Sequence, residues 1–137
     1  MRRPVAGEEI PPYVMSEITT DRVRALMELM RDTNPVHDDP ELIARRGLRG
    51  PVNQGPANLA YMLDMLFAWA GPELEIERFD FRFHEIVVPG DTVTARGTVR
   101  SAAENDDLTR AECDVRLEHA DGSIAVSGTA VVRIPAR

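Results

Sequence analysis

The segment from Arg31 to Pro40 carries the residues of this chain best suited to chemistry. Asp32 stands five positions before His37, and Asn34-Pro35 lies between them. Proline lacks a backbone N–H and disfavours helical dihedrals in the residue before it, so the segment is expected to turn. Such a turn would direct the carboxylate and the imidazole at one water molecule, as a general acid/base pair that adds or removes water. The alternative is that Asp32 only helps to form the turn and that His37 is an ordinary surface histidine.

Two helices are expected to position this segment. The first begins at a cap formed by Thr19 or Thr20, shows apolar residues at helical spacing, and must end before Pro35. Its end therefore delivers Asp32 on a rigid element. One or two further helical turns are expected over residues 40–46.

The second helix, expected over residues 55–70, is much more apolar than the first. Gly55-Pro56 opens it, because proline suits the first helical turn, and Gly71-Pro72 ends it. Only Asn58 and Asp64 are clearly polar in this stretch. A helix that is apolar nearly all round is expected to be buried on most sides.

From Leu74 onward apolar residues alternate with polar ones, which is typical of strands with one buried face. Four long strands are expected there, and Asp121-Gly122 predicts a hairpin between the last two. A further short strand is expected over residues 13–18, after Pro11-Pro12. The predicted fold class is α+β, with a curved antiparallel sheet wrapped around the buried helix. The apolar positions of the first long strand are Phe79, Phe81 and Phe83.

Composition limits the classes of function. The chain has 137 residues, which predict a single domain over residues 1–137, and its net charge is −7. This charge argues against a nucleic-acid partner, because nucleic-acid binders present a basic face. The single Cys113 cannot form an internal disulfide, and no set of cysteines could hold a metal. The sequence shows no signal peptide and no apolar run that could span a bilayer, so a soluble, cytoplasmic protein without a membrane partner is expected.

Helix, sheet and turn together resemble the hot-dog fold and, within it, the MaoC-like (R)-specific enoyl-CoA hydratases. The signature of that family is Asp, a variable residue, Asn-Pro, an aliphatic residue, His, and Asp two positions on. It is matched here by Asp32, Asn34, Pro35, Val36, His37 and Asp39. A Gly-Pro-aliphatic run that ends in glycine before the helix is matched by Gly50, Pro51, Val52 and Gly55. The resemblance covers residues 10–134.

The resemblance implies that Asp32 and His37 activate one water. The water adds to C3 of a trans-2-enoyl thioester of coenzyme A or of an acyl carrier, and the product is an (R)-3-hydroxyacyl thioester. Either residue could be the base. The thioester oxygen needs a donor, and the Gly55 amide at the helix N-terminus is the best candidate. Asn34 is expected to order the turn, with substrate contact as the alternative, and Gln54 is expected to contact substrate or support the turn. No metal and no separate cofactor are expected.

Two further groups of residues have open roles. Arg45, Arg46 and Arg49 could bind the phosphates of coenzyme A or of a carrier-protein arm, or they form a solvated basic loop. His84 lies on the polar side of a strand and His119 lies beside a turn, and both are expected to be surface residues.

Three positions depart from the family pattern. Arg31 stands where glycine is usual, Ile43 where a small residue is usual, and Gln54 where histidine is common. None of these departures removes a catalytic group, and together they predict a pocket of altered shape or substrate.

Two functions from other classes stay open, namely a non-catalytic or heterodimer-partner subunit and a hot-dog thioesterase. Thioesterases of this fold generally carry their carboxylate on the central helix, where this chain has Asp64 rather far along. A dimer is expected in either case, as a homodimer or with a related hot-dog chain, because one sheet around so apolar a helix leaves surface uncovered.

Overall fold

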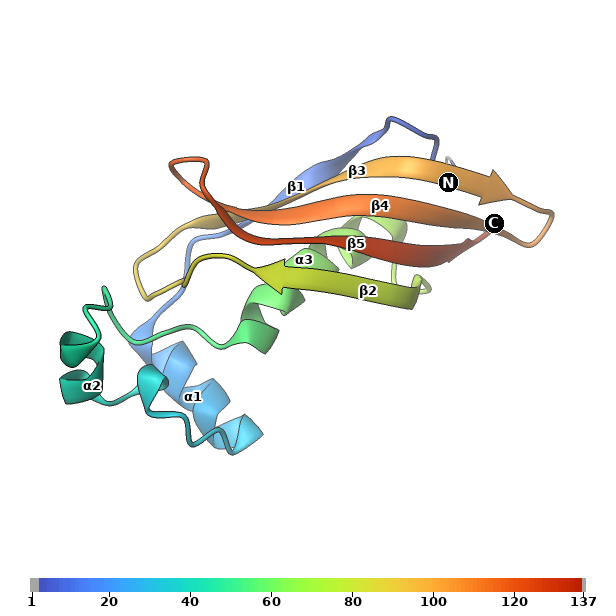
Figure 1. Cartoon of the computed structure of the whole chain (residues 1–137). Coiled ribbons are helices and arrows are strands. Elements are labelled where there is room, and N and C mark those ends of the chain that lie inside the picture. The colour runs from blue at the N-terminus through green and yellow to red at the C-terminus, as the bar shows by residue number, and fades with distance from the viewer. Residues whose placement is uncertain (1–2, 137) are drawn as a thin grey trace.

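The computed structural model describes residues 3–136, and its centre is one antiparallel sheet of five strands (Figure 1). Along the sheet the strands lie in the order β1-β3-β4-β5-β2, so β1 and β2 form the two edges. The α+β prediction is confirmed, and the fifth strand is the short one expected before the first helix. The strands are β1 (Glu9–Met15), β2 (Glu75–Phe83), β3 (Val93–Glu104), β4 (Leu108–His119) and β5 (Ile124–Pro135).

Helix α3 (Gly55–Ala70) packs against one face of this sheet. Met62, Met65 and Leu66 are fully buried and form the centre of the core. The sheet comes close to the helix at Gly97, where an added Cβ would lie 3.1 Å from Met65 Cε. The opposite side of α3 is exposed in the single chain at Asp64 and Phe67, so the helix is buried on fewer sides than predicted.

Strand β1 begins before the two prolines rather than after them, so the prediction of a strand over residues 13–18 was shifted. The pairing of β1 with β3 changes register between Ile10 and Tyr13, and Pro11 and Pro12 occupy that irregularity. Prolines are tolerated there because an edge strand has one side without a hydrogen-bonding neighbour.

A separate group of short helices lies off one end of the sheet (Figure 1). Thr19 caps the first of them by accepting a hydrogen bond from Arg22 N, and Asp39 caps the last one. Val23 of the first helix and Ile43 of the last are buried. Its members are α1 (Thr20–Met30), the 3-10 turn η1 (Pro35–His37) and α2 (Pro40–Arg45).

Strand β2 departs from the prediction that its phenylalanines are buried. Phe79 packs against the core, but Phe81 and Phe83 are 45% and 49% exposed. The three rings form a continuous row, with centroid separations of 5.7 and 5.4 Å. Because β2 is an edge strand, it has a neighbouring strand on one side only, and its outer part is covered less than the centre of the sheet.

Candidate active site

Asp32 and His37 meet as the sequence predicted. Asp32 Oδ2 lies 3.1 Å from His37 Nε2. The Asp32 backbone N–H donates to Met27 O at the end of α1, and its Oδ1 accepts from Asn34 N, so the carboxylate is held at a fixed place. His37 closes η1 and is buried, whereas Asp32 is partly open to solvent.

A second contact fixes the tautomer of His37. Its Nδ1 lies 2.5 Å from the carbonyl oxygen of Val52, which precedes α3. A carbonyl oxygen can only accept, so Nδ1 carries hydrogen and Nε2 is the atom that exchanges a proton. Nε2 faces the Asp32 carboxylate, so an imidazole nitrogen and a carboxylate oxygen lie side by side. That is what an acid/base pair for one water requires.

Asn34 orders the turn, as expected. Its Oδ1 accepts a hydrogen bond from Val36 N and so caps η1. Pro35 follows at the first position of η1, where its missing N–H costs nothing.

A cleft of about 400 Å³ opens beside His37. Its walls come from the η1 segment, from the start of α3 and from the end of β2. Residues of these three walls include Asn34, Val36, His37, Gly55, Asn58 and Phe83.

Gly55 stands at the N-terminus of α3 and lines this cleft. Its backbone N–H makes no hydrogen bond within residues 3–136, and Pro56 after it has no N–H to offer. A Cβ at Gly55 would lie 2.9 Å from the ring of Phe83, so a larger residue would displace a wall of the cleft. The N-terminus therefore presents a free donor and the positive end of the helix dipole to the cleft.

Gln54 has a different setting from the other expected site residues. It is 1% exposed and its Nε2 donates to Val23 O in α1, at 2.9 Å. Its Oε1 is enclosed without a hydrogen-bonding partner. In this structure Gln54 joins α3 to α1 and is not part of the cleft lining.

Arg31 has φ 52° and ψ 41°, the left-handed conformation, where it ends α1. Glycine adopts this conformation without strain, and most other residues do not. The geometry gives a physical reason why glycine is usual at this position. The Arg31 side chain faces water, as expected for an arginine without a buried partner.

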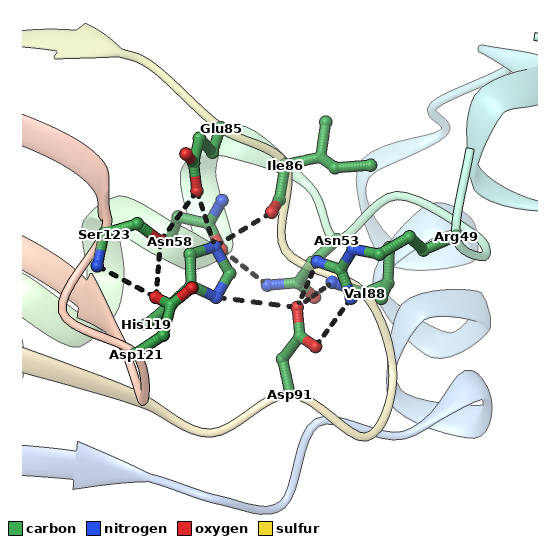
Figure 2. Close-up of polar contacts among 10 residues, drawn as sticks. All are labelled: Arg49, Asn53, Asn58, Glu85, Ile86, Val88, Asp91, His119, Asp121 and Ser123. Atoms are coloured by element: carbon green, nitrogen blue, oxygen red, sulfur yellow. Dashed lines mark hydrogen bonds and ion pairs between the residues drawn. The ribbon is translucent and has the colours of Figure 1, made fainter. Parts of the chain in front are cut away.

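The three arginines after the Asp-His segment do not act as one cluster. Arg45 and Arg46 are exposed and form no ion pair in the described part of the chain. Arg49 instead donates to both carboxylate oxygens of Asp91 at 2.9 Å (Figure 2). This contact holds the pKa of Asp91 below its usual value.

The prediction that His119 is a simple surface residue was wrong. Its side chain is 12% exposed, and its Nε2 lies 3.1 Å from Ile86 O (Figure 2). The carboxylates of Glu85 and Asp91 lie 3.7 Å from its two ring nitrogens. His119 thus links the β4–β5 hairpin to the loop after β2. His84 is exposed as predicted, and its Nε2 lies 2.7 Å from Ser127 Oγ at the rim of the cleft.

A buried amide network behind the cleft had no assigned role in the sequence. Asn53 Nδ2 donates to Asn58 Oδ1 at 2.8 Å and to Tyr61 Oη at 3.2 Å. One feature of the sequence could have indicated this network, because Asn58 is one of two clearly polar residues on an otherwise apolar helix.

With this geometry in view, comparison with known proteins identifies the family. The model of the MaoC like domain matches residues 8–121, which is most of the chain. The chain belongs to the MaoC-like dehydratase family. The predicted resemblance is therefore confirmed, and residues 32–39 lie inside the matched domain.

Relatives of known name and structure agree with this family. The peroxisomal hydratase-dehydrogenase-epimerase of Saccharomyces cerevisiae is 34% identical over 97 residues, which are 67% of this chain but only 10% of the yeast protein. The (R)-hydratase from A. caviae involved in PHA biosynthesis superposes with a TM-score of 0.84 at 26% identity, over 98% of this chain and 100% of that one. A chain of the ChsH1-ChsH2 complex from Mycobacterium tuberculosis has the same fold, with a TM-score of 0.79 at 22% identity over 95% and 98% of the two chains. The hot-dog fold is thereby established for this MaoC-like chain.

Proposed function

We propose that this MaoC-like protein hydrates trans-2-enoyl thioesters reversibly and so acts as an enoyl-CoA hydratase or 3-hydroxyacyl thioester dehydratase. The observation that carries the proposal is the 3.1 Å contact between Asp32 Oδ2 and the Nε2 of His37, which lines an open cleft. The likeness to an (R)-hydratase supports the same reaction and the (R) product.

In the proposed reaction the Asp32–His37 pair holds one water. One partner takes a proton from that water as its oxygen bonds to C3 of the substrate. The pair then returns one proton to C2, so that the elements of water are added across the double bond. Val52 O keeps His37 Nδ1 protonated, which leaves Nε2 as the atom that passes the proton.

Addition at C3 moves electron density onto the thioester oxygen, which must be stabilised. The free Gly55 N–H is the donor proposed for this oxygen, at the positive end of α3. The ring of Phe83 packs on Gly55 and forms the wall of the cleft beside this donor. Asn34 supports the reaction indirectly because it caps the turn that carries His37.

The carrier group of the thioester, either coenzyme A or an acyl-carrier arm, is proposed to lie against the basic loop after α2. Arg45 and Arg46 are exposed and unpaired in the described chain, so they are free to meet phosphates. Arg49 fits this role less well, because both oxygens of Asp91 already occupy its guanidinium group. Coenzyme A and an acyl-carrier arm share the phosphate chemistry that these arginines would bind.

No observation favours the thioesterase alternative. Asp64 is exposed and lies nine residues after Gly55, which places it about 13 Å further along the helix axis. A carboxylate at that distance does not share the cleft with His37.

We also propose that the functional unit contains a second hot-dog chain, either a copy of this one or a related partner. The outer part of β2 supports this, because the exposed Phe81 and Phe83 lie on an edge strand. The structurally similar chain of the ChsH1-ChsH2 complex also belongs to a complex.

The reaction class is tested with a panel of trans-2-enoyl thioesters, followed by ultraviolet absorbance and by a thiol reagent. A hydratase loses the absorbance of the conjugated double bond without releasing thiol, whereas a thioesterase releases thiol. Burial raises the pKa of the Cys113 thiol to about 11, so the protein itself adds little to the thiol signal. No change with any coenzyme A or carrier-protein substrate would instead favour the non-catalytic subunit.

A further inference from the structure

Asn58 presents one side of its amide to a buried partner and the other side to the cleft. The residue is 3% exposed and its Oδ1 is held by Asn53 Nδ2. Its Nδ2 makes no hydrogen bond within residues 3–136. Figure 2 shows the amide nitrogen pointing away from Asn53.

This nitrogen is unpaired but not enclosed. Among the described residues, Gln54 Oε1 is the only fully enclosed side-chain nitrogen or oxygen that lacks a partner. Asn58 Nδ2 therefore reaches open space, and the open space that Asn58 lines is the cleft beside His37. A largely buried amide that leaves its two N–H groups free is costly unless something binds there.

The helix directs this amide toward Gly55. Asn58 lies three residues after Gly55 in α3, so the two share one face of the helix. Helical side chains tilt toward the N-terminus and cover the preceding turn, which here is the turn that begins at Gly55. The free N–H of Gly55 and the free amide of Asn58 thus point into the same region of the cleft.

The donor is also held in place before substrate arrives. Asn53 contacts both Asn58 Oδ1 and Tyr61 Oη, and its backbone N–H donates to Val87 O at 2.7 Å. An amide fixed in this way loses little freedom when it binds an oxyanion, and preorganised donors of this kind contribute strongly to catalysis.

We propose that Asn58 is a catalytic residue that donates the second hydrogen bond to the thioester oxygen, together with Gly55 N–H. The inference rests on the proposed hydration reaction. As the water oxygen bonds to C3, the electron pair of the C2=C3 bond shifts toward C1, and the carbonyl oxygen becomes an enolate. Asn58 and Gly55 stabilise that charge until C2 takes its proton and the carbonyl re-forms.

The test compares three variants with trans-2-butenoyl-coenzyme A as substrate. Asn58→Asp keeps an oxygen for Asn53 but replaces the donor by an acceptor, and Asn58→Leu removes both groups at similar volume. Tyr61→Phe is the matched control, because it removes one contact of Asn53 without reaching the cleft. Thermal unfolding and the Kd of the saturated butanoyl thioester show whether each variant is folded and binds.

Loss of one oxyanion donor is expected to lower kcat about 100-fold. We expect this loss for Asn58→Asp and Asn58→Leu, with KM and the Kd of the saturated thioester changed much less, and near-normal kcat for Tyr61→Phe. If a folded Asn58→Asp or Asn58→Leu variant keeps near-normal kcat, or if Tyr61→Phe loses as much, Asn58 is not the donor although hydration stands. A wild-type protein no more active than Asp32→Asn would overturn the hydration itself, and the role of Asn58 with it.

Discussion

Asp32 and His37 are held by contacts on both sides of the pair, from Asn34 N and Val52 O. Asp32→Asn removes the carboxylate, and His37→Gln removes the titratable ring, with little change in volume. General acid–base catalysis contributes about 100-fold to 10,000-fold, so we expect each variant to lose at least 100-fold in kcat. Initial rates with an enoyl thioester measure this loss, and thermal unfolding serves as the control for folding. A variant that keeps a tenth of wild-type turnover would remove the pair from the catalytic centre.

Asp91 gives the chain a pH-dependent contribution to stability. Its pKa is lowered by the hydrogen bonds from Arg49, and also by the bond from Val88 N. The folded state therefore binds this proton less readily than the unfolded chain. The contribution is present above the unfolded pKa of about 4 and is lost as the pH falls through the lower folded value.

We therefore expect Asp91→Asn to be less stable than wild type at pH 7, by about 1 kcal/mol for a partly exposed pair. The difference is expected to shrink toward zero as the pH falls below 4. Urea unfolding of both proteins between pH 3 and pH 7 measures it. A difference that is constant across this range would show that the ionised carboxylate is not its cause.

At the scale of elements, α1 ends in a conformation that its sequence does not favour. Arg31 adopts a φ of 52°, and a side chain in the left-handed region costs about 1 kcal/mol or more. We expect Arg31→Gly to raise the free energy of unfolding by about 1 kcal/mol, because glycine relieves this strain. The measurement is urea unfolding at neutral pH.

Arg24→Gly is the matched control for this prediction, since Arg24 is exposed in the interior of the same helix. Glycine in a helix interior is expected to lower stability by about 1 kcal/mol. If both variants are destabilised equally, the conformation of Arg31 is not a source of strain. If Arg31→Gly also keeps its activity, arginine at this position is not required for the reaction.

At the scale of the whole molecule, the two edges of the sheet differ. The edge strand β2 exposes a row of aromatic rings, whereas β1 exposes the isolated Val14. The sheet is therefore expected to pair through β2, the edge strand that carries the exposed Phe81 and Phe83. Large exposed apolar rows on an edge strand usually mark an interface.

We expect the purified protein to have twice the 15.2 kDa mass of one chain in light scattering at micromolar concentration. Phe81→Asp should shift it toward the monomer, because a charge in an apolar interface is costly. Val14→Asp on the other edge should leave the mass unchanged. A monomeric wild-type protein, or a dimer that Val14→Asp rather than Phe81→Asp dissociates, would contradict pairing through β2.

Local rules in the sequence predicted the helices and the Asp-His turn closely. Thr19 caps α1 and Gly55 opens α3 where these residues were expected to act, and Pro35 opens η1 in a segment that was expected to turn. Such features depend on dihedral limits and capping by residues a few positions apart, so adjacent residues determine them. The strand over residues 13–18 was misplaced because proline is excluded from central strands, and the position of β1 at an edge is not visible locally.

The sequence by itself determined which residues turn, which helix is apolar, and which residue types stand near one another in the Asp-His segment. Only the tertiary structure decided that Val52 O holds His37, that Gln54 reaches α1, and that Asn58 turns its amide toward the cleft. It also decided that Arg49 is occupied by Asp91 and that His119 is partly buried. These contacts join segments that lie 15 or more residues apart, or follow from which face of α3 meets the cleft. They depend on how the sheet curves around the helix, which no local spacing specifies.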